Sequence, residues 1–185
     1  MSEERGENFF TELLKFIIIA AAIVIPVRIY VAQPFIVSGA SMEPTFDNGE
    51  YLIVDELSYR FNGPERYDVV IFRYPRNPSE FFIKRIVGLP NETVHINETE
   101  VSVTRKDGAN IALDERYVRN KGNGGASVVN LGEGEYFVMC DNRPASSDSR
   151  VWGTLPRENI TGRALLRLFP LRDFGIFPGS VSEKP

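Results

Sequence analysis

Apolar and polar positions divide the chain into one N-terminal apolar run and a long series of short alternating segments. No charged residue occurs in the run from Phe16 to Val27, and Lys15 and Arg28 flank it with side chains long enough to reach lipid headgroups. Extended to residues 9–32, the run reaches the length of one membrane-spanning helix. We therefore expect a transmembrane anchor at 9–32, after a cytoplasmic flank at 1–8.

A cleavable secretory signal is the competing interpretation of this run. Such a signal has a positively charged leading segment and a small-x-small pair at its cleavage site. Residues 1–15 instead hold four glutamates against Arg5 and Lys15, and no clean small-x-small pair follows Arg28. The pattern favours a retained anchor. Because positive charges lie on both sides of the run, they do not determine its orientation.

Beyond the anchor, β-branched and aromatic residues recur in short runs separated by Gly, Pro, Asn and Asp, which predicts a mostly β domain at 33–180. The close spacing of the runs indicates antiparallel sheets. The expected strands are Tyr51–Val54, Asp68–Arg73, Phe81–Val87, Thr93–Ile96, Val101–Thr104, Ser127–Val129 and Tyr136–Met139.

Two segments of this domain differ in character from the rest. The stretch at about 91–134 is more polar and richer in glycine, and we expect a hairpin-rich insertion there. The stretch from Leu165 to Phe177 is rich in leucine and phenylalanine, so it is either core or a surface patch that contacts lipid, and we favour core. A short tail is expected at 181–185.

Composition narrows the classes of partner and site. About 150 residues lie outside the anchor, which is the size of one ordinary domain. The net charge of −4 and the lack of a basic tail argue against a nucleic-acid partner. Cys140 is the single cysteine, so an internal disulfide is excluded, and the chain lacks the Cys/His spacing of a zinc site. We expect neither a metal nor a cofactor.

The first candidate catalytic residue is Ser41, a possible nucleophile in the segment Ser38–Thr45. Ser41 lies nine residues beyond Ala32, hence within about 30 Å of the membrane surface at the reach of an extended chain. Serine is a poor nucleophile unless a base takes its proton, and the usual base is histidine. The only histidine, His95, lies in the polar insertion, where an ordinary position on a sheet surface is favoured. The sequence therefore argues against a Ser-His-Asp triad.

A neutral lysine is the other base that serine proteases use. Lys84 shares one strand face with Phe82 and Ile86, which would surround its amine with apolar groups if that face is buried. Keeping a lysine with an ordinary pKa of about 10.4 neutral at pH 7 costs about 4.6 kcal/mol, and full burial lowers a lysine pKa by roughly 3 to 5 units. Full burial would therefore be sufficient to keep the Lys84 amine neutral near pH 7. A solvated lysine on an edge strand is the alternative, and position alone does not decide between them.

Four motifs follow one another along the chain: Ser38–Thr45, Tyr67–Val70, Lys84–Pro90 and Asp141–Gly153. Together with the preceding anchor, they resemble the bacterial type I signal peptidases, peptidase family S26, over nearly the whole chain. The resemblance implies an antiparallel β domain of the LexA/signal peptidase type. It also implies a membrane-anchored serine endopeptidase that cleaves signal peptides from exported preproteins after an Ala-x-Ala junction, with its active site on the extracytoplasmic side of the plasma membrane.

The same resemblance assigns roles to individual residues. Ser41 would be the nucleophile and the principal oxyanion donor through its backbone N–H, and Lys84 the general base. Ser146 would orient the lysine amine. Gly39 stands where many relatives carry a serine that donates a second hydrogen bond to the oxyanion, and Cys140 stands where the family usually has glycine. A buried, inert thiol is the favoured interpretation of Cys140 over a redox role.

The remaining implied roles concern structure and substrate. Asp148 and Arg150 resemble a structural ion pair of the family. The preprotein would bind as an extended strand, so its residues at −3 and −1 would point the same way into shallow pockets. The positions that match the family's pocket lining, for which ordinary core packing is an even alternative, are Phe35, Val37, Met42, Phe82 and Ile83.

Three other interpretations stay open. The anchor and the acidic charge argue against a self-cleaving LexA repressor, which shares the serine-lysine core but carries a DNA-binding domain. Intact Ser41, Lys84 and Ser146 argue against a degenerate relative that only binds peptides, for which Gly39 and Cys140 are the support. Lys84 also argues against the archaeal and eukaryotic signal peptidase type, which has a histidine in place of the lysine.

Overall fold

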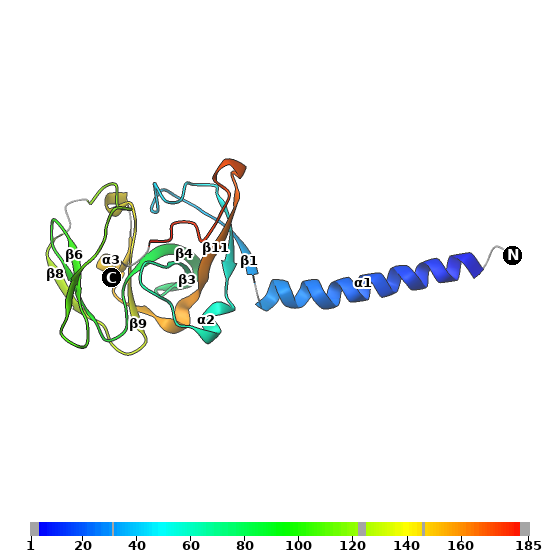
Figure 1. The fold of residues 1–185 in the computed structure, drawn as a ribbon, viewed down its shortest axis with the longest axis horizontal. Coiled ribbons are helices and arrows are strands. Elements are labelled where there is room, and N and C mark those ends of the chain that lie inside the picture. The colour runs from blue at the N-terminus through cyan, green and yellow to red at the C-terminus, as the bar shows by residue number, and fades with distance from the viewer. Residues whose placement is uncertain (1–3, 31, 122–124, 146, 182–185) are drawn as a thin grey trace.

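The protein consists of a long N-terminal helix followed by a β domain, as seen in a computed structural model (Figure 1). The structure describes residues 4–30, 32–121, 125–145 and 147–181. Helix α1 (Glu4–Tyr30) projects away from the β domain, which it joins next to β1 (Figure 1). The catalytic chemistry is therefore expected from the β domain alone.

Helix α1 occupies the range expected for a membrane anchor. Its apolar side chains, including Phe10, Phe16 and Ile19, are exposed. Within the described residues, no helix combines the length and the apolar character that crossing a membrane requires. Charged residues occur up to Lys15 and return at Arg28, which leaves twelve uncharged positions against the ~20 of a typical span. The expected span is therefore not confirmed.

An antiparallel sheet forms the main body of the domain, in the order β1-β2-β11-β3-β4-β9-β10, with β12 paired to β11. Its strands are β1 (Ala32–Ile36), β2 (Tyr51–Asp55), β3 (Val69–Tyr74), β4 (Asn77–Gly88), β9 (Glu135–Met139), β10 (Leu155–Pro156), β11 (Ile160–Phe169) and β12 (Gly175–Ile176). Short helices lie between them: α2 (Ser58–Phe61), η1 (Arg143–Ala145), α3 (Ser149–Trp152), η2 (Arg157–Asn159) and η3 (Leu171–Asp173).

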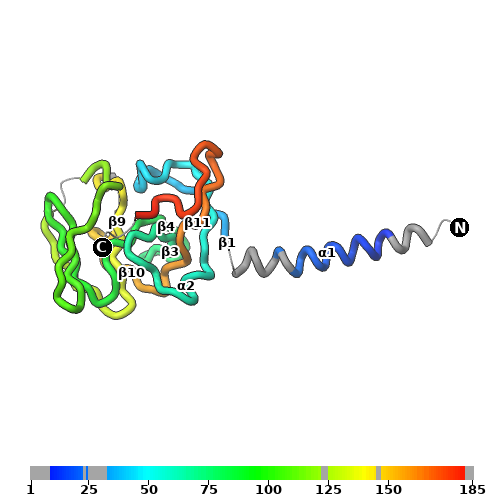
Figure 2. The backbone as a smooth tube through the Cα atoms, in the orientation of Figure 1, coloured from blue at the N-terminus to red at the C-terminus, as the bar shows by residue number. Residues whose placement is uncertain are grey.

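A second antiparallel sheet, in the order β7-β6-β5-β8, lies within the range 91–134 that was expected to be an insertion. Its strands are β5 (Thr93–Ile96), β6 (Val101–Thr104), β7 (Asn110–Ala112) and β8 (Ser127–Asn130). Figure 2 shows this part of the chain, in green, at the end of the domain opposite α1. The second sheet therefore lies away from the point where the N-terminal helix enters.

The prediction of a mostly β, antiparallel domain is confirmed, and all seven expected strands are present as β2, β3, β4, β5, β6, β8 and β9. The long central strand β11 was missed. Its buried positions are Ile160, Gly162 and Ala164, two of them small. A Cβ at Gly162 would lie 2.3 Å from Asp55 O, so the neighbouring strand β2 requires a glycine there. A strand packed this closely lacks the bulky residues that reveal a strand in a sequence.

The expectation that Leu165–Phe177 is core is wrong. Ala164 just before it is buried, but most of the large apolar side chains that follow are exposed. These exposed side chains lie next to Ile36 of β1 and Tyr51 of β2, because Tyr51 pairs with both Ile36 and Phe169. The ring centroids of Tyr51 and Phe169 are 6.0 Å apart, in an edge-to-face arrangement. We call this surface the apolar corner, and its residues are Ile36, Tyr51, Phe169, Leu171, Phe174 and Ile176.

Strand β4 is fixed by packing on both of its faces. Val87 packs with Phe137 in the cluster that joins the two sheets. Ile86 packs with Val138 and Trp152 on the opposite face. Close packing on both faces leaves a strand little freedom to shift. The other side chains of β4 therefore project from a rigid backbone.

Candidate active site

Ser41 lies in the loop between β1 and β2, whose base is closed by backbone hydrogen bonds. Val37 N–H donates to Glu50 O and Gly49 N–H donates to Val37 O, each at 2.9 Å. Met42, next to Ser41, is 1% exposed and packs with other buried side chains of the β1–β3 region. The apolar neighbour thus anchors the loop in the core and leaves the polar side chain of Ser41 outside it.

A second loop, which follows β9, holds Ser41 from the other side. Asn142 N–H donates to Ser41 O at 3.0 Å, and Asn142 Nδ2 donates to Ala40 O at 3.0 Å. Thr45 Oγ1 donates to Asp141 Oδ2 at 2.5 Å. These contacts join segments about 100 residues apart in the sequence, and the sequence motifs did not predict them. They fix the backbone on both sides of the nucleophile candidate.

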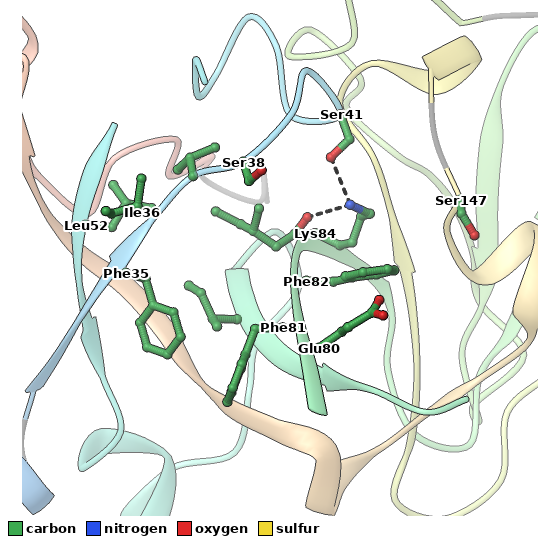
Figure 3. A pocket seen from close by; sticks show the side chains of 13 residues that line it. Phe35, Ile36, Ser38, Ser41, Leu52, Glu80, Phe81, Phe82, Lys84 and Ser147 are labelled. Carbon is green, nitrogen blue, oxygen red and sulfur yellow. Dashed lines mark hydrogen bonds between the residues drawn. The ribbon is translucent and has the colours of Figure 1, made fainter. Parts of the chain in front are cut away.

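Lys84 lies within hydrogen-bonding distance of Ser41, as Figure 3 shows. Its Nζ is 2.9 Å from Ser41 Oγ and 2.8 Å from Ile83 O. The side chain extends from β4 past the ring of Phe82 and is 5% exposed. The strand face that carries Lys84 is therefore buried, which is the condition that the sequence had left open.

Burial changes the acid–base properties of this lysine. The pKa of Lys84 is lowered from its ordinary value of 10.5, chiefly because burial removes water from the ammonium form. The side chains of Cys140, Asp148 and Asp141 act in the opposite direction and raise the pKa. Burial is the larger effect, so the neutral amine that a general base requires forms more readily here than in a solvated lysine.

The side chain after Lys84 points to the opposite face of β4 and forms a buried ion pair. Arg85 Nε donates to Asp141 Oδ1 at 2.9 Å and its terminal nitrogen to Asp141 Oδ2 at 2.6 Å. Both side chains are 0% exposed. The guanidinium also donates to Tyr67 O at 3.0 Å and to Gly179 O at 2.6 Å. This pair was not predicted, and it links β4 to the loop that holds Ser41.

The expected ion pair of Asp148 and Arg150 is present. Arg150 Nε and its terminal nitrogen donate to the two Asp148 carboxylate oxygens, each at 2.8 Å. Asp148 also caps α3 by accepting from Arg150 N–H, and it accepts from Cys140 N–H at 3.1 Å. The carboxylate therefore ties the end of β9 to α3. Ser146, in the same loop, lies outside the described residues, so its assigned role stays a prediction.

A cavity of about 420 Å³ opens beside Ser41 and Lys84. Four of the five predicted pocket residues line it, namely Phe35, Val37, Phe82 and Ile83. Met42 does not, because it is buried in the core behind the loop. The other residues that line the cavity are Ile36, Ser38, Leu52, Ile71, Glu80, Phe81 and Ser147. Most of these are apolar, so the cavity suits small apolar side chains more than charged ones.

Ser41 and Gly39 occupy the two positions that the family resemblance assigns to the oxyanion site, and their backbone N–H groups differ in their present hydrogen bonds. Within the described part of the chain, Ser41 N–H donates to no other residue and is therefore free to bind an oxyanion. Gly39 N–H donates to Asn48 Oδ1 at 2.8 Å. Gly39 could serve an oxyanion only after that bond breaks. His95 lies in β5 of the second sheet, where its Nε2 is 2.9 Å from Thr104 Oγ1, so it occupies the sheet position favoured from the sequence.

Comparisons with known proteins all point to one family. The family model for signal peptidase, peptidase S26, matches residues 10–169. A probable signal peptidase I-1 of Synechocystis sp. is 34% identical over 175 residues, covering 91% of this chain and 87% of the relative. Signal peptidase I of Bacillus licheniformis is 32% identical over 182 residues, covering 94% of this chain and 97% of the relative.

Among solved structures, a signal peptidase I from Enterococcus faecalis V583 aligns with a TM-score of 0.47 at 28% identity, covering 55% of this chain and 97% of that chain. The sequence comparisons extend over more of the chain. Because the family match spans most of the chain and the relatives align over most of their own length, the chain belongs to the signal peptidase family, peptidase S26, and is an enzyme of the signal peptidase I type.

Proposed function

We propose that the chain is a membrane-associated serine endopeptidase that cleaves signal peptides from exported preproteins, with Ser41 as nucleophile and Lys84 as general base. The observation that carries the proposal is the 2.9 Å separation of Lys84 Nζ from Ser41 Oγ, made by a lysine that is buried. The relatives are signal peptidases I, and this name supplies the substrate class.

In the proposed acylation step, neutral Lys84 accepts the proton of the Ser41 hydroxyl while Oγ bonds to the carbonyl carbon of the scissile peptide. The carbonyl oxygen becomes an oxyanion, which the Ser41 N–H stabilises by a hydrogen bond. Lys84, now an ammonium, gives its proton to the leaving amine as the C–N bond breaks. The mature protein leaves, and the signal peptide stays on Ser41 as an ester.

In the proposed deacylation step, Lys84 is neutral again and takes a proton from a water molecule. The hydroxide attacks the ester carbon, the same N–H stabilises the second oxyanion, and the proton returns to Ser41 Oγ as the ester bond breaks. One lysine thus acts as base and then as acid in each half of the reaction. In both steps Ser41 and Lys84 carry the proton transfers, and the predicted role of Ser146 is to orient the lysine amine.

Strand addition is the binding mode that we propose for the substrate. Strand β4 pairs with β3 along Phe81–Arg85, but its pairing with β9 begins only at Arg85. Within the described residues, the other edge of Phe81–Lys84 is unpaired and borders the cavity. An extended peptide can add backbone hydrogen bonds to such an edge, and alternate side chains then point into the cavity.

The proposal predicts a period-two specificity. Replacing alanine by leucine at position −1 or −3 of a synthetic precursor peptide should lower kcat/KM by about 10- to 100-fold. We expect the bound peptide strand to fill the cavity, so that a leucine side chain would overpack it at a cost of ~1–3 kcal/mol. The same replacement at −2, whose side chain points away from the cavity, is the matched control and should change kcat/KM less than about threefold. The measurement is cleavage rate by mass spectrometry. Equal losses at −1 and −2 would contradict strand-like binding.

The proposal also places the enzyme at the plasma membrane, with the catalytic domain on the extracytoplasmic side. The exposed apolar side chains of α1 and the apolar corner support attachment to lipid. Replacing both Ile18 and Ile19 with aspartate should lower recovery of the chain with lipid vesicles in a flotation assay by at least about fivefold. Val128→Asp, at an exposed position of the second sheet, is the control. Equal flotation of the α1 variant and the control would count against attachment through α1.

A further inference from the structure

Glu80 is the one acidic residue that lines the active-site cavity within the described part of the chain. Lys84 is the other charged residue of the lining, and it belongs to the catalytic end, where it meets Ser41. Glu80 precedes Lys84 by four positions on β4, hence by about 13 Å along the strand at ~3.3 Å per residue. The cavity therefore has the catalytic pair toward one end and a carboxylate toward the other.

The charge of Glu80 is exposed and has no cationic partner. Asn77 Nδ2 donates to Glu80 Oε1 at 2.7 Å, which orients the carboxylate, but a neutral amide does not balance its charge. The two arginines of the β3–β4 hairpin are engaged elsewhere. Arg73 stacks on the ring of Phe81 at 5.0 Å, and Arg76 donates to a backbone carbonyl of α3 at 3.3 Å. Across the residues that the structure describes, Glu80 forms no ion pair.

The two sides of β4 offer a bound peptide different surroundings. Side chains alternate along a strand, so Phe81 and Ile83 share one side, and Glu80 and Phe82 share the other. Figure 3 shows Phe81 on the side of Phe35, and Glu80 with Phe82 on the opposite side. The ring centroids of Phe35 and Phe81 are 5.3 Å apart, and Ile83 packs against the apolar cluster of β1–β3. One side of the strand is thus an apolar lining, and the other is an open rim with a carboxylate.

The proposed strand addition determines which substrate residue lies beside Glu80. The carbonyl carbon of residue −1 must reach Ser41 Oγ, which places −1 level with Ile83, next to the catalytic lysine. Upstream residues advance by ~3.3 Å each, as those of β4 do, so residue −4 lies level with Glu80. The small side chains at −1 and −3 take the apolar side of β4. The side chains at −2 and −4 therefore take the side of Phe82 and Glu80.

We propose that Glu80 is a specificity-determining residue that favours preproteins with a basic side chain at position −4 and disfavours an acidic one there. The inference rests on the proposed cleavage at Ser41 and adds a substrate feature beyond the small residues at −1 and −3. A lysine or arginine at −4 has a stem long enough to lie along Phe82 and bring its charge to the carboxylate. A glutamate at −4 would place two like charges at the same rim, which repel.

The size of the preference follows from the exposure of Glu80. Exposed ion pairs are weak, so replacing lysine by glutamate at −4 should lower kcat/KM about fivefold to tenfold at 0.1 M salt. The loss should lie mainly in KM, because −4 is remote from the reacting bond and its contacts are the same in the ground state and the transition state. At 1 M salt, where the Debye length is ~3 Å, the ratio of the two kcat/KM values should fall below about twofold.

Charge exchange on both partners tests the assignment. Two synthetic precursors, identical except for lysine or glutamate at −4, are cleaved in non-ionic detergent by the full chain, and the ratio of their kcat/KM values is measured. Glu80→Gln should bring this ratio within about twofold of one, and Glu80→Lys should invert it. Glu98→Gln, at an exposed bend of the second sheet, is the matched control and should keep the wild-type ratio. A wild-type ratio near one, or a ratio that survives Glu80→Gln, would overturn the proposal.

A binding measurement makes the test independent of cleavage. Ser41→Ala in the full chain is titrated against the same two peptides, each with an N-terminal fluorophore, and Kd is measured by fluorescence polarisation. The lysine peptide should bind about fivefold more tightly than the glutamate peptide, and adding Glu80→Gln should remove the difference. Equal Kd values for the two peptides would overturn the proposal. Failure of folded wild type to cleave either peptide would instead contradict the proposed function, and the Kd values would still decide the role of Glu80.

Discussion

Replacing Lys84 with arginine should abolish cleavage even though the positive charge is kept. Arginine keeps its proton at every working pH and therefore cannot act as a neutral base. We expect kcat/KM on a synthetic Ala-x-Ala precursor to fall by at least about 10⁴-fold, as for other proteases that lose one member of a proton-transfer pair. Lys84→Ala should lose as much, because both variants lack the proton acceptor 2.9 Å from Ser41 Oγ.

Lys106→Arg is the matched control, since Lys106 is exposed in a turn far along the chain from the active-site loops. It should retain wild-type kcat/KM within about twofold. A Lys84→Arg variant that is folded and keeps more than about 1% of wild-type kcat/KM would exclude lysine as the base.

The dependence of wild-type kcat/KM on pH should also show that a neutral lysine is the base. Activity requires neutral Lys84, so kcat/KM should rise with pH and fall as the pH drops below the pKa of this group. Burial lowers that pKa from 10.5, hence the midpoint of the rising limb should lie below 10.5. A profile that rises only with the titration of an ordinary solvated lysine would contradict the role of burial.

Replacing Asp141 with alanine should cause the largest loss of stability. The pair with Arg85 is 0% exposed on both sides and has two charge-assisted hydrogen bonds. Removing one member of a buried pair leaves the other charge without compensation, which costs ~3–5 kcal/mol in the free energy of unfolding. Chemical denaturation of the full chain in detergent would measure this loss through the shift of the unfolding midpoint.

Asp173→Ala is the matched control for this stability loss, because the pair of Asp173 with Arg172 is exposed. An exposed ion pair contributes ~0–1 kcal/mol, so this control should leave the unfolding midpoint nearly unchanged. Similar losses for Asp141→Ala and Asp173→Ala would mean that the buried pair does not stabilise the domain.

Loss of Asp141 should also reduce catalysis in any fraction that stays folded. Asp141 accepts from Thr45, and the next residue, Asn142, donates two hydrogen bonds to the backbone at Ala40 and Ser41. The ion pair therefore stabilises the contact between the loop after β9 and the nucleophile loop. Stability and activity are coupled at this point of the fold.

Local patterns predicted much of what the structure has. Alternation around Lys84 and runs of β-branched residues were sufficient to place β4 and six other strands, because both are properties of neighbouring residues. The prediction that Ser41 and Lys84 lie together required a family resemblance. The two residues are 43 positions apart in the sequence, and no local pattern indicates a contact between them. The structure brings them to 2.9 Å, which is the geometry that the proposed mechanism needs.

Features that depend on distant contacts were not predictable in this way. Strand β11 carries small residues because Asp55 of β2 approaches Gly162, and that approach is visible only after folding. The leucines and phenylalanines after Ala164 were predicted to be core, yet most of them are exposed. The reason is that β11 extends beyond the end of the domain core. Met42 matched a pocket position but turns into the core. The Arg85–Asp141 pair joins positions 56 residues apart in the sequence.

The most direct test of the account is mass spectrometry of an Ala-x-Ala precursor after incubation with the full chain in detergent, using wild type, Ser41→Ala and Ser127→Ala. Ser127 is exposed at the start of β8 in the second sheet and serves as the matched serine control. We predict a single cut after the second alanine by wild type and Ser127→Ala, and none by Ser41→Ala. Cleavage by folded Ser41→Ala at the wild-type rate, or no cleavage by folded wild type, would contradict the assignment of Ser41 as the nucleophile of a signal peptidase.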